Sequence, residues 1–136
     1  MKERYLERLT ADGDRLYLTT GYGSCYGSYK PGTDTTDHLT IFELGQQKLA
    51  RGFDDTLGVS GFSVMGSDGS RLFLSLYNAG VLVLDATDPL RPNGVAFLRT
   101  LGWGSHLELS GNTMFVAAGQ FGVFQRDLGQ PQLKPF

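Results

Sequence analysis

The sequence predicts an all-β protein built from a repeated antiparallel sheet, and three observations support this prediction. The pattern that runs from 70 to 85 returns 42 residues later, so that Arg71 corresponds to Thr113 and Asp85 to Asp127. Glycine makes up 19 of the 136 residues, and tight turns favour glycine. Apolar residues occur in short runs between these turns, which is typical of many short strands. A period near 42 with such strands is typical of the four-stranded blades of a β-propeller.

A third copy of the pattern precedes these two and is divided into two parts. Its first part begins at Arg15, 56 residues before Arg71, whereas its second part begins at Leu39, 42 residues before Val81. The difference of 14 residues falls in 20–37, between the second and third strands of the first blade. We expect this insertion to form the longest and most mobile loop.

The strands are expected in the order that an up-and-down blade requires. The expected ranges are 5–11, 15–20, 39–43, 50–54, 81–85, 95–100 and 123–127. Before the second strand of each blade, Gly13, Gly69 and Gly111 occupy equivalent turns, where a positive φ favours glycine. Aromatic residues recur at Tyr17, Phe73 and Phe115, and aliphatic residues at Leu18, Leu74 and Val116. These columns are predicted to be core, because neighbouring blades bury both faces of a sheet.

Each third strand ends in an acidic residue, namely Glu43, Asp85 and Asp127. The segment after Asp85 contains two prolines and side chains that cap turns, which indicates an exposed connection. A calcium loop at Asp85 and Asp88 is the sharper alternative. It is less favoured, because no third oxygen ligand follows at the spacing of a calcium loop.

Composition restricts the classes of partner. The 12 basic and 14 acidic side chains give a net charge of −2 and are scattered singly, so we expect no nucleic-acid partner. No apolar run approaches the length of a membrane span, and residues 1–8 lack the apolar segment of a signal peptide. The single cysteine, Cys25, forms no internal disulfide and leaves the redox compartment open.

The segment Gly80-Val81-Leu82-Val83-Leu84-Asp85-Ala86-Thr87-Asp88-Pro89, with its echo at Leu39-Thr40-Ile41-Phe42-Glu43, resembles the LVIVD-type repeat of bacterial β-propellers. The stretch 102–124 is similar to the last blade of exported bacterial propeller-domain proteins. This resemblance implies the propeller fold and favours an extracytoplasmic location, and it transfers no catalytic residue. The chain departs from the family pattern at Gln125 and Arg126, where the family has apolar residues, and this departure suits a more exposed strand.

The sequence therefore predicts one partial propeller over 1–136, with blades at about 5–58, 59–101 and 102–136. The last blade is expected to lack its outer strand. We expect the chain to be the C-terminal part of a larger propeller, packed against upstream blades, or a half that pairs with a second copy. Apolar side chains at the outermost blades, of the Leu72, Leu74 and Phe115 type, are expected to be partly exposed and to favour association.

Function is expected on the rim where the connections from second to third strand and from blade to blade emerge. Aromatic and polar residues in these connections suit ligand contact. The candidate ligand-binding residues are Tyr22, Tyr26, Tyr29, Asp34, Asp37, His38, Tyr77, Asn78, Trp103, His106 and Phe121. The alternative interpretation of 21–38 is a glycine-rich loop that only covers a neighbour.

Motifs with sharper chemistry are weak, and no catalytic residue, metal site or cofactor is predicted. No helix follows Gly21-Tyr22-Gly23 to bind a phosphate. Cys25 with Asp34, Asp37 and His38 has loose spacing for a metal site. His106 and Glu108 could form an acid/base pair that faces the channel, but a hydrogen-bonded structural histidine is favoured.

The favoured function is a non-catalytic interaction or scaffold module that binds a protein or a saccharide on its rim. The alternative is a metal-dependent propeller hydrolase or lactonase. Such enzymes need ligands from several blades, whereas the sequence equivalents of His106 are Val64 and Arg8. The interaction module is therefore favoured over the enzyme, and the question of enzymatic activity is left open.

Overall fold

The computed structural model describes residues 5–21, 38–45, 48–56, 62–76 and 79–129. Its elements are β1 (Tyr5–Asp12), β2 (Arg15–Gly21), β3 (His38–Gly45), β4 (Lys48–Thr56), β5 (Ser63–Ser67), β6 (Arg71–Ser75), β7 (Val81–Asp85), β8 (Asn93–Leu98), β9 (His106–Ser110), β10 (Thr113–Ala117), the short 3₁₀ helix η1 (Gly119–Phe121) and β11 (Val123–Asp127). In the part of the chain that is described, no helix has the length and apolar character needed to cross a membrane.

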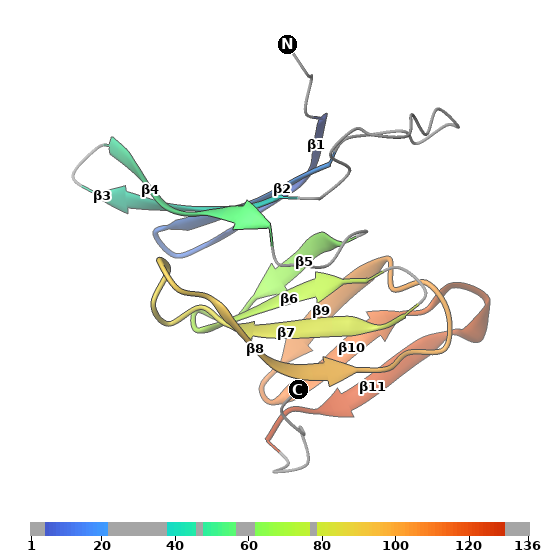
Figure 1. Ribbon diagram of the computed structural model, residues 1–136. Helices are drawn as coiled ribbons and strands as arrows, with labels where there is room; N and C mark the ends of the chain where they lie inside the picture. Colours follow the sequence, from blue (N-terminus) through green and yellow to red (C-terminus); the bar gives the residue numbers. More distant parts are fainter. Residues whose placement is uncertain (1–4, 22–37, 46–47, 57–61, 77–78, 130–136) are drawn as a thin grey trace.

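The strands form three antiparallel sheets, in each of which every strand pairs with its neighbour in the sequence. The N-terminal sheet has the order β1-β2-β3-β4, the central sheet β5-β6-β7-β8, and the C-terminal sheet β9-β10-β11. The N-terminal and C-terminal sheets lie on opposite sides of the central sheet (Figure 1). The all-β class and the expected strand order are confirmed, and each expected strand overlaps an observed one.

The predicted repeat is also confirmed at the level of single residues. Arg15, Arg71 and Thr113 each begin the second strand of their sheet. At the end of the third strand or directly after it, the backbone N–H of Leu44, Ala86 and Leu128 donates in each sheet to the carbonyl oxygen that precedes the second strand, at 2.7 Å in all three cases. The hairpin glycines Gly13, Gly69 and Gly111 have φ values of 58°, 90° and 57°, as the turn chemistry predicts.

The acidic residues that end β7 and β11 stabilise turns. A carboxylate oxygen of Asp85 accepts a hydrogen bond from Thr87 N at 2.9 Å, and Asp127 accepts one from Gly129 N at 2.8 Å. The bond from Thr87 lowers the pKa of Asp85. Asp88 likewise accepts from Leu90 N at 2.9 Å. Both carboxylates of the considered calcium loop therefore bind backbone N–H groups of their own connection.

Two apolar cores separate the three sheets. Leu72 and Leu74 of β6 face the N-terminal sheet, whereas Phe73 between them faces the C-terminal sheet. The first core includes Tyr17, Leu39, Ile41, Val64, Leu72, Leu74, Leu82 and Leu84, and the second includes Phe73, Val81, Val83, Leu98, Leu107, Met114 and Val116. The central sheet is therefore buried on both faces.

The predicted columns of core residues need a correction at the outer sheets. Tyr17 and Phe73 are fully buried, but Leu18 is only half-buried, and so is Phe115, which was also expected to be partly exposed because it belongs to an outermost sheet. Each of these two lies on a face that no other described sheet covers. Leu72 and Leu74, expected to be partly exposed, are fully buried, because they belong to the central sheet.

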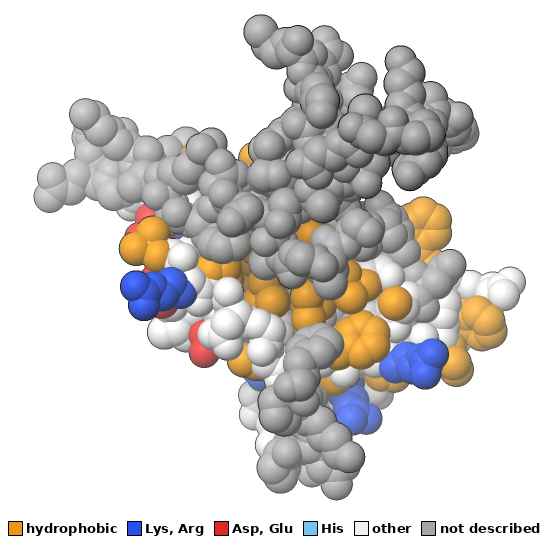
Figure 2. Space-filling model, viewed as in Figure 1, with side chains coloured by type: hydrophobic (Ala, Val, Ile, Leu, Met, Phe, Trp, Pro, Cys, Tyr) orange, Lys and Arg blue, Asp and Glu red, His pale blue; other side chains and the backbone are white. Residues whose placement is uncertain are grey.

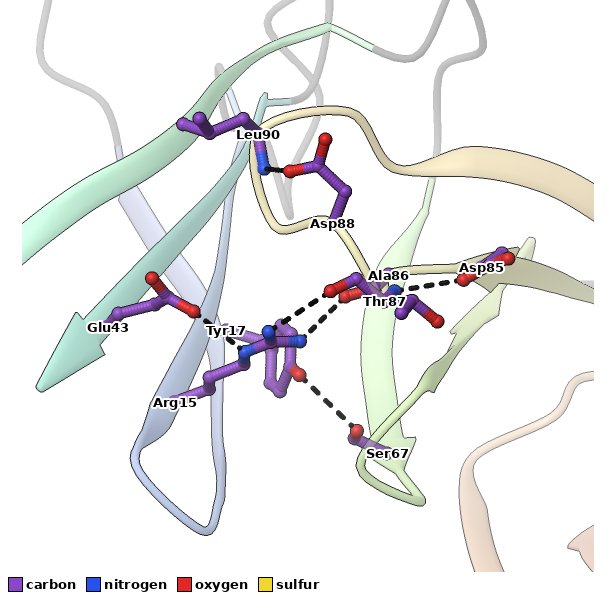
Figure 3. A network of polar contacts seen from close by, with 9 residues as sticks. All are labelled: Arg15, Tyr17, Glu43, Ser67, Asp85, Ala86, Thr87, Asp88 and Leu90. Atoms are coloured by element: carbon purple, nitrogen blue, oxygen red, sulfur yellow. Dashed lines mark hydrogen bonds and ion pairs between the residues drawn. The ribbon is translucent and has the colours of Figure 1, made fainter.

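Arg15 joins the N-terminal sheet to the connection after β7 (Figure 3). Its guanidinium donates to Ala86 O at 2.6 Å and to Thr87 O at 3.3 Å, and it pairs with Glu43 at 3.1 Å. Burial lowers the pKa of Arg15, but interactions with Tyr17 and Glu43 outweigh burial, so the pKa is raised. One side chain thus connects two sheets of the repeat.

Candidate functional site

The structure describes only some of the residues that the sequence predicted on the rim. Tyr22, Tyr26, Tyr29, Asp34, Asp37, Tyr77 and Asn78 lie outside the described residues, as do Ser24 and Cys25. His38 is the first residue of β3, where its backbone pairs with Thr20 and Thr56. Trp103, His106 and Phe121 are described with their side chains. The site is therefore built from these three residues and their neighbours.

The connections β6–β7 and β10–β11 have the same backbone hydrogen bonds. Leu76 N donates to Gly80 O at 2.9 Å, and its equivalent Ala118 N donates to Gly122 O at 2.8 Å. A second bond closes each turn, from Ala79 N to Leu76 O at 2.9 Å and from Phe121 N to Ala118 O at 3.2 Å. The repeated turn fixes the backbone of Phe121.

The ring of Phe121 lies against the backbone of Gly102. A Cβ atom at Gly102 would be 2.6 Å from Phe121 Cδ2 and 2.9 Å from Ala118 O, and the φ of Gly102 is 100°. Only glycine fits such an approach. The contact brings the connection β8–β9, which carries Trp103, to the connection β10–β11, which carries Phe121. The structure therefore brings together two segments that the sequence predicted to share a rim.

Three large apolar side chains project from these two connections. Trp103 is 56% exposed, Phe121 57% and Leu101 72%. We call Leu101, Trp103 and Phe121 the apolar edge. The sequence analysis missed Leu101, because it considered aromatic and polar residues. The signal was its place beside Gly102, next to the only tryptophan of the chain.

Residues 100–105, which carry Leu101 and Trp103 of the apolar edge, are held by several polar contacts. Thr100 Oγ1 donates to Gly102 O at 3.0 Å, and the buried hydroxyl of Ser75 donates to Gly104 O at 2.7 Å. Arg8, from β1, donates to Ser105 O at 3.2 Å. Residues 100–105 are therefore tied to both other sheets, which reduces the entropic cost of presenting an exposed side chain to a ligand.

His106 and Glu108 form a pair on β9. His106 Nε2 lies 2.9 Å from Glu108 Oε1, and their side chains are 62% and 75% exposed. Both lie on the face of the C-terminal sheet that points away from the central sheet, since Leu107 between them is packed in the second core. The histidine is hydrogen-bonded, as the favoured interpretation expected, but it is not buried.

The residues equivalent to His106 need one correction. In the strand ladders, His106 pairs with Ala117, Ser63 with Ser75, and Arg8 with Thr19. Ser63, not Val64, therefore occupies the position of His106, whereas Arg8 is correctly placed. The cause is a β-bulge between Val64 and Gly66 in β5, where β9 pairs without interruption. A one-residue bulge moves each earlier side chain to the other face.

Figure 2 shows one face of the molecule, on which hydrophobic and charged side chains lie among the described residues. Hydrophobic side chains lie across the middle of this face, and the basic side chains lie apart toward its margins (Figure 2). Within the ranges that are described, no three His, Cys, Asp or Glu residues gather as a group that could hold a metal ion. The described part of the rim is therefore an apolar edge beside an exposed histidine–carboxylate pair.

Comparisons of the chain with models of protein families, with curated proteins and with solved structures find no match.

Proposed function

We propose that this chain is a non-catalytic interaction module of the β-propeller type that binds a protein or saccharide ligand at the apolar edge. In this proposal the three sheets are propeller blades and β1, β5 and β9 are their innermost strands. Two features support the blade assignment: the consecutive antiparallel order in each sheet, and the position shared by Arg8, Ser63 and His106 in the three first strands.

The observation that carries the proposed function is the exposure of Trp103 and Phe121 on connected, well-fixed segments. Aromatic side chains provide a large contact area at a low cost in conformational entropy, and they dominate binding energy in many interfaces. They also have flat apolar faces on which the apolar side of a sugar ring or a peptide side chain can rest. Gly102 and the contacts of Ser75 and Arg8 hold this edge before a ligand arrives.

The single tryptophan makes the proposal directly testable. The protein is applied to an array of saccharides and to a displayed peptide library. Each ligand found is titrated into the wild type while the fluorescence of Trp103 is followed, and into the wild type and the variants by calorimetry. Trp103→Ala and Phe121→Ala are expected to weaken binding about 30-fold or more, which corresponds to the roughly 2 kcal/mol of an interface hot spot.

Leu90→Ala is the matched control. Leu90 is 61% exposed, but it lies in the connection after β7, so its variant is expected to bind like the wild type. Binding that survives both aromatic substitutions would contradict the proposed edge. An absence of any ligand in both the saccharide and peptide arms would contradict the proposed function.

The His106–Glu108 pair is the one described feature that favours the second candidate, a metal-dependent propeller hydrolase or lactonase. An imidazole and a carboxylate at 2.9 Å supply two metal-ligating or acid/base groups. Elemental analysis of the purified protein tests this candidate. Stoichiometric zinc or calcium that is lost in His106→Ala would favour the hydrolase over the interaction module.

A further inference from the structure

Among the residues that the structure describes, two sheet faces with exposed apolar side chains are covered by no other sheet, and they lie at opposite ends of the stack of sheets. The first is the outer face of the N-terminal sheet, here called the N-face, and the second is the outer face of the C-terminal sheet, here called the C-face. The N-face includes Leu9, Leu16, Leu18, Phe42 and Leu44. The C-face includes Phe115, Ala117, Val123 and Gln125, together with the exposed His106–Glu108 pair. Because the sheets are repeats, each face can be compared with two covered equivalents.

The N-face has the residues that, in the other sheets, pack on the preceding sheet. The strand ladders place Leu9 at the position of Val64 and Leu107. Leu9 is 55% exposed, whereas Val64 is 0% and Leu107 6% exposed. The repeat therefore identifies an apolar position that loses its cover only in the N-terminal sheet.

A second position of the N-face shows the same contrast. Leu44, Ala86 and Leu128 donate equivalent backbone hydrogen bonds at the end of the third strand of each sheet or directly after it. Leu44 is 49% exposed, whereas Ala86 is 0% and Leu128 5% exposed. A leucine that is as large as the buried Leu128 is thus in contact with solvent on the N-face, where an unused surface would favour a polar residue.

The C-face has the residues that, in the other sheets, pack on the following sheet. Val123 is 68% exposed, whereas its equivalents Val81 and Leu39 are 0% exposed. Phe115 is half-buried, whereas its equivalent Phe73 is fully buried. The C-face therefore retains the aromatic and aliphatic residues of a sheet-packing surface.

The two faces are complementary halves of one interface. Within the chain, a face of the C-type from one sheet packs on a face of the N-type from the next sheet twice, once in each core. We propose that a second copy of this chain binds head to tail, so that the N-face of one copy packs on the C-face of the other. A second copy is the favoured occupant because one chain has both halves, in the register that its own cores already use.

The geometry of this contact determines the assembly. The contact joins two different surfaces, and such heterologous contacts close into rings or continue as filaments. Two copies together supply six sheets and can satisfy both interfaces in a closed ring, so a dimer is expected. Gln125 occupies the position of the fully buried Val83. A polar residue there weakens packing, and the dimer is expected to dissociate on dilution.

The inference is tested by sedimentation or light scattering over a concentration series of the full chain. The wild type is expected to change from monomer to dimer as its concentration rises. Leu44→Asp on the N-face and Val123→Asp on the C-face are each expected to weaken dimerisation at least tenfold. Leu90→Asp, at an exposed leucine outside both faces, is expected to leave the dimer intact. Far-UV circular dichroism establishes that each variant is folded.

A mixture of the two aspartate variants is the decisive arm. In a head-to-tail contact, the intact C-face of Leu44→Asp can pack on the intact N-face of Val123→Asp. The mixed dimer has one interface without a substitution, whereas each variant alone has a substitution in both interfaces, so the mixture is expected to form a heterodimer through the intact interface at concentrations where each variant alone is monomeric. The milder pair Leu9→Ala and Phe115→Ala repeats the comparison if an aspartate variant does not fold.

Three outcomes would overturn the inference. The first is a wild type that remains monomeric throughout the series. The second is a dimer that only one of the two face variants disrupts, which indicates an interface between identical faces. The third is a mixture that stays monomeric, which indicates that the two faces do not meet. Leu101, Trp103 and Phe121 lie outside the strands of both faces, so a failure of dimerisation would leave the proposed ligand binding at the apolar edge untouched.

Discussion

Phe73 and Phe115 occupy the same position in successive sheets, but Phe73 is fully buried between two sheets whereas Phe115 is half-buried on an uncovered face. Phe73→Ala removes a ring from a closed core and leaves a cavity. It is expected to lower the free energy of unfolding by about 3–5 kcal/mol. Phe115→Ala is expected to cost about 1 kcal/mol in the monomer, because its ring is already partly hydrated. Urea unfolding at low protein concentration measures both, and equal losses would contradict the assignment of faces.

Arg15 tests how strongly the N-terminal sheet is attached to the central sheet. Its two hydrogen bonds to Ala86 O and Thr87 O are charge-assisted. Arg15→Ala is expected to lower the free energy of unfolding by about 1.5–3 kcal/mol. Arg15→Lys keeps the charge but loses the planar fork, so an intermediate loss is expected. The exposed Arg99 gives the control, and a loss in Arg99→Ala as large as that in Arg15→Ala would disprove a specific role.

The ion pair of Asp68 with Arg71 is expected to make the free energy of unfolding depend on pH in the acidic range. Burial raises its pKa, but hydrogen bonds and the charge of Arg71, at 2.6 Å from Asp68 Oδ2, outweigh burial and lower the pKa below 3.8. A group with a lowered pKa in the folded state contributes stability above its ordinary pKa. This contribution is expected to disappear as the pH falls below about 4.

Thermal unfolding of the wild type and of Asp68→Asn measures this contribution. The difference in melting temperature is expected to be constant near neutral pH and to shrink as the pH falls through the lowered pKa of Asp68. Asp14→Asn, at an exposed carboxylate, is the control. A wild-type advantage over Asp68→Asn that persists at pH 2 would show that the ion pair is not its source.

Alanine substitutions at Gly80 and Gly13 distinguish the energetic cost of steric conflict from the cost of backbone strain. Both have positive φ, 142° at Gly80 and 58° at Gly13. A Cβ at Gly13 has no atom within 4 Å, whereas at Gly80 it would overlap the carbonyl oxygen of Leu98 and lie 3.0 Å from Arg99 Cα. Gly13→Ala is expected to cost about 1–2 kcal/mol. Gly80→Ala is expected to cost more than about 3 kcal/mol, because β8 must move. Equal losses in urea unfolding would contradict this close approach.

The repeat made much of the fold predictable. Arg15, Arg71 and Thr113 were placed at equivalent strand starts, because turn glycines and alternating apolar residues recur with them. The bulge in β5 was not predictable, since Met65 looks like any other apolar residue of a strand. That one residue decides whether Val64 or Ser63 corresponds to His106. Sequence spacing therefore determined the elements but not the register within one of them.

The candidate site was predictable only in part, for a different reason. Trp103 and Phe121 were expected on one rim from the order of strands and connections. The contact of the Phe121 ring with Gly102 depends on a tertiary approach that no local pattern encodes. Leu9 and Leu44, in contrast, carried a signal in the repeat, since their equivalents are buried in both other sheets. Comparing each position across the copies would have identified them.

The regular pairing of β2 with β3 shows how little the first sheet is constrained by what connects its strands. The pairing runs from Arg15 and Glu43 to Thr20 and His38 without a shift, although 22–37 separates the two strands. The equivalent connection after β6 spans only 76–80. A connection about three times longer costs roughly 1 kcal/mol in loop-closure entropy. The length of this connection can therefore differ between copies of the repeat at little thermodynamic cost, so an insertion at this point leaves the register of the sheet intact.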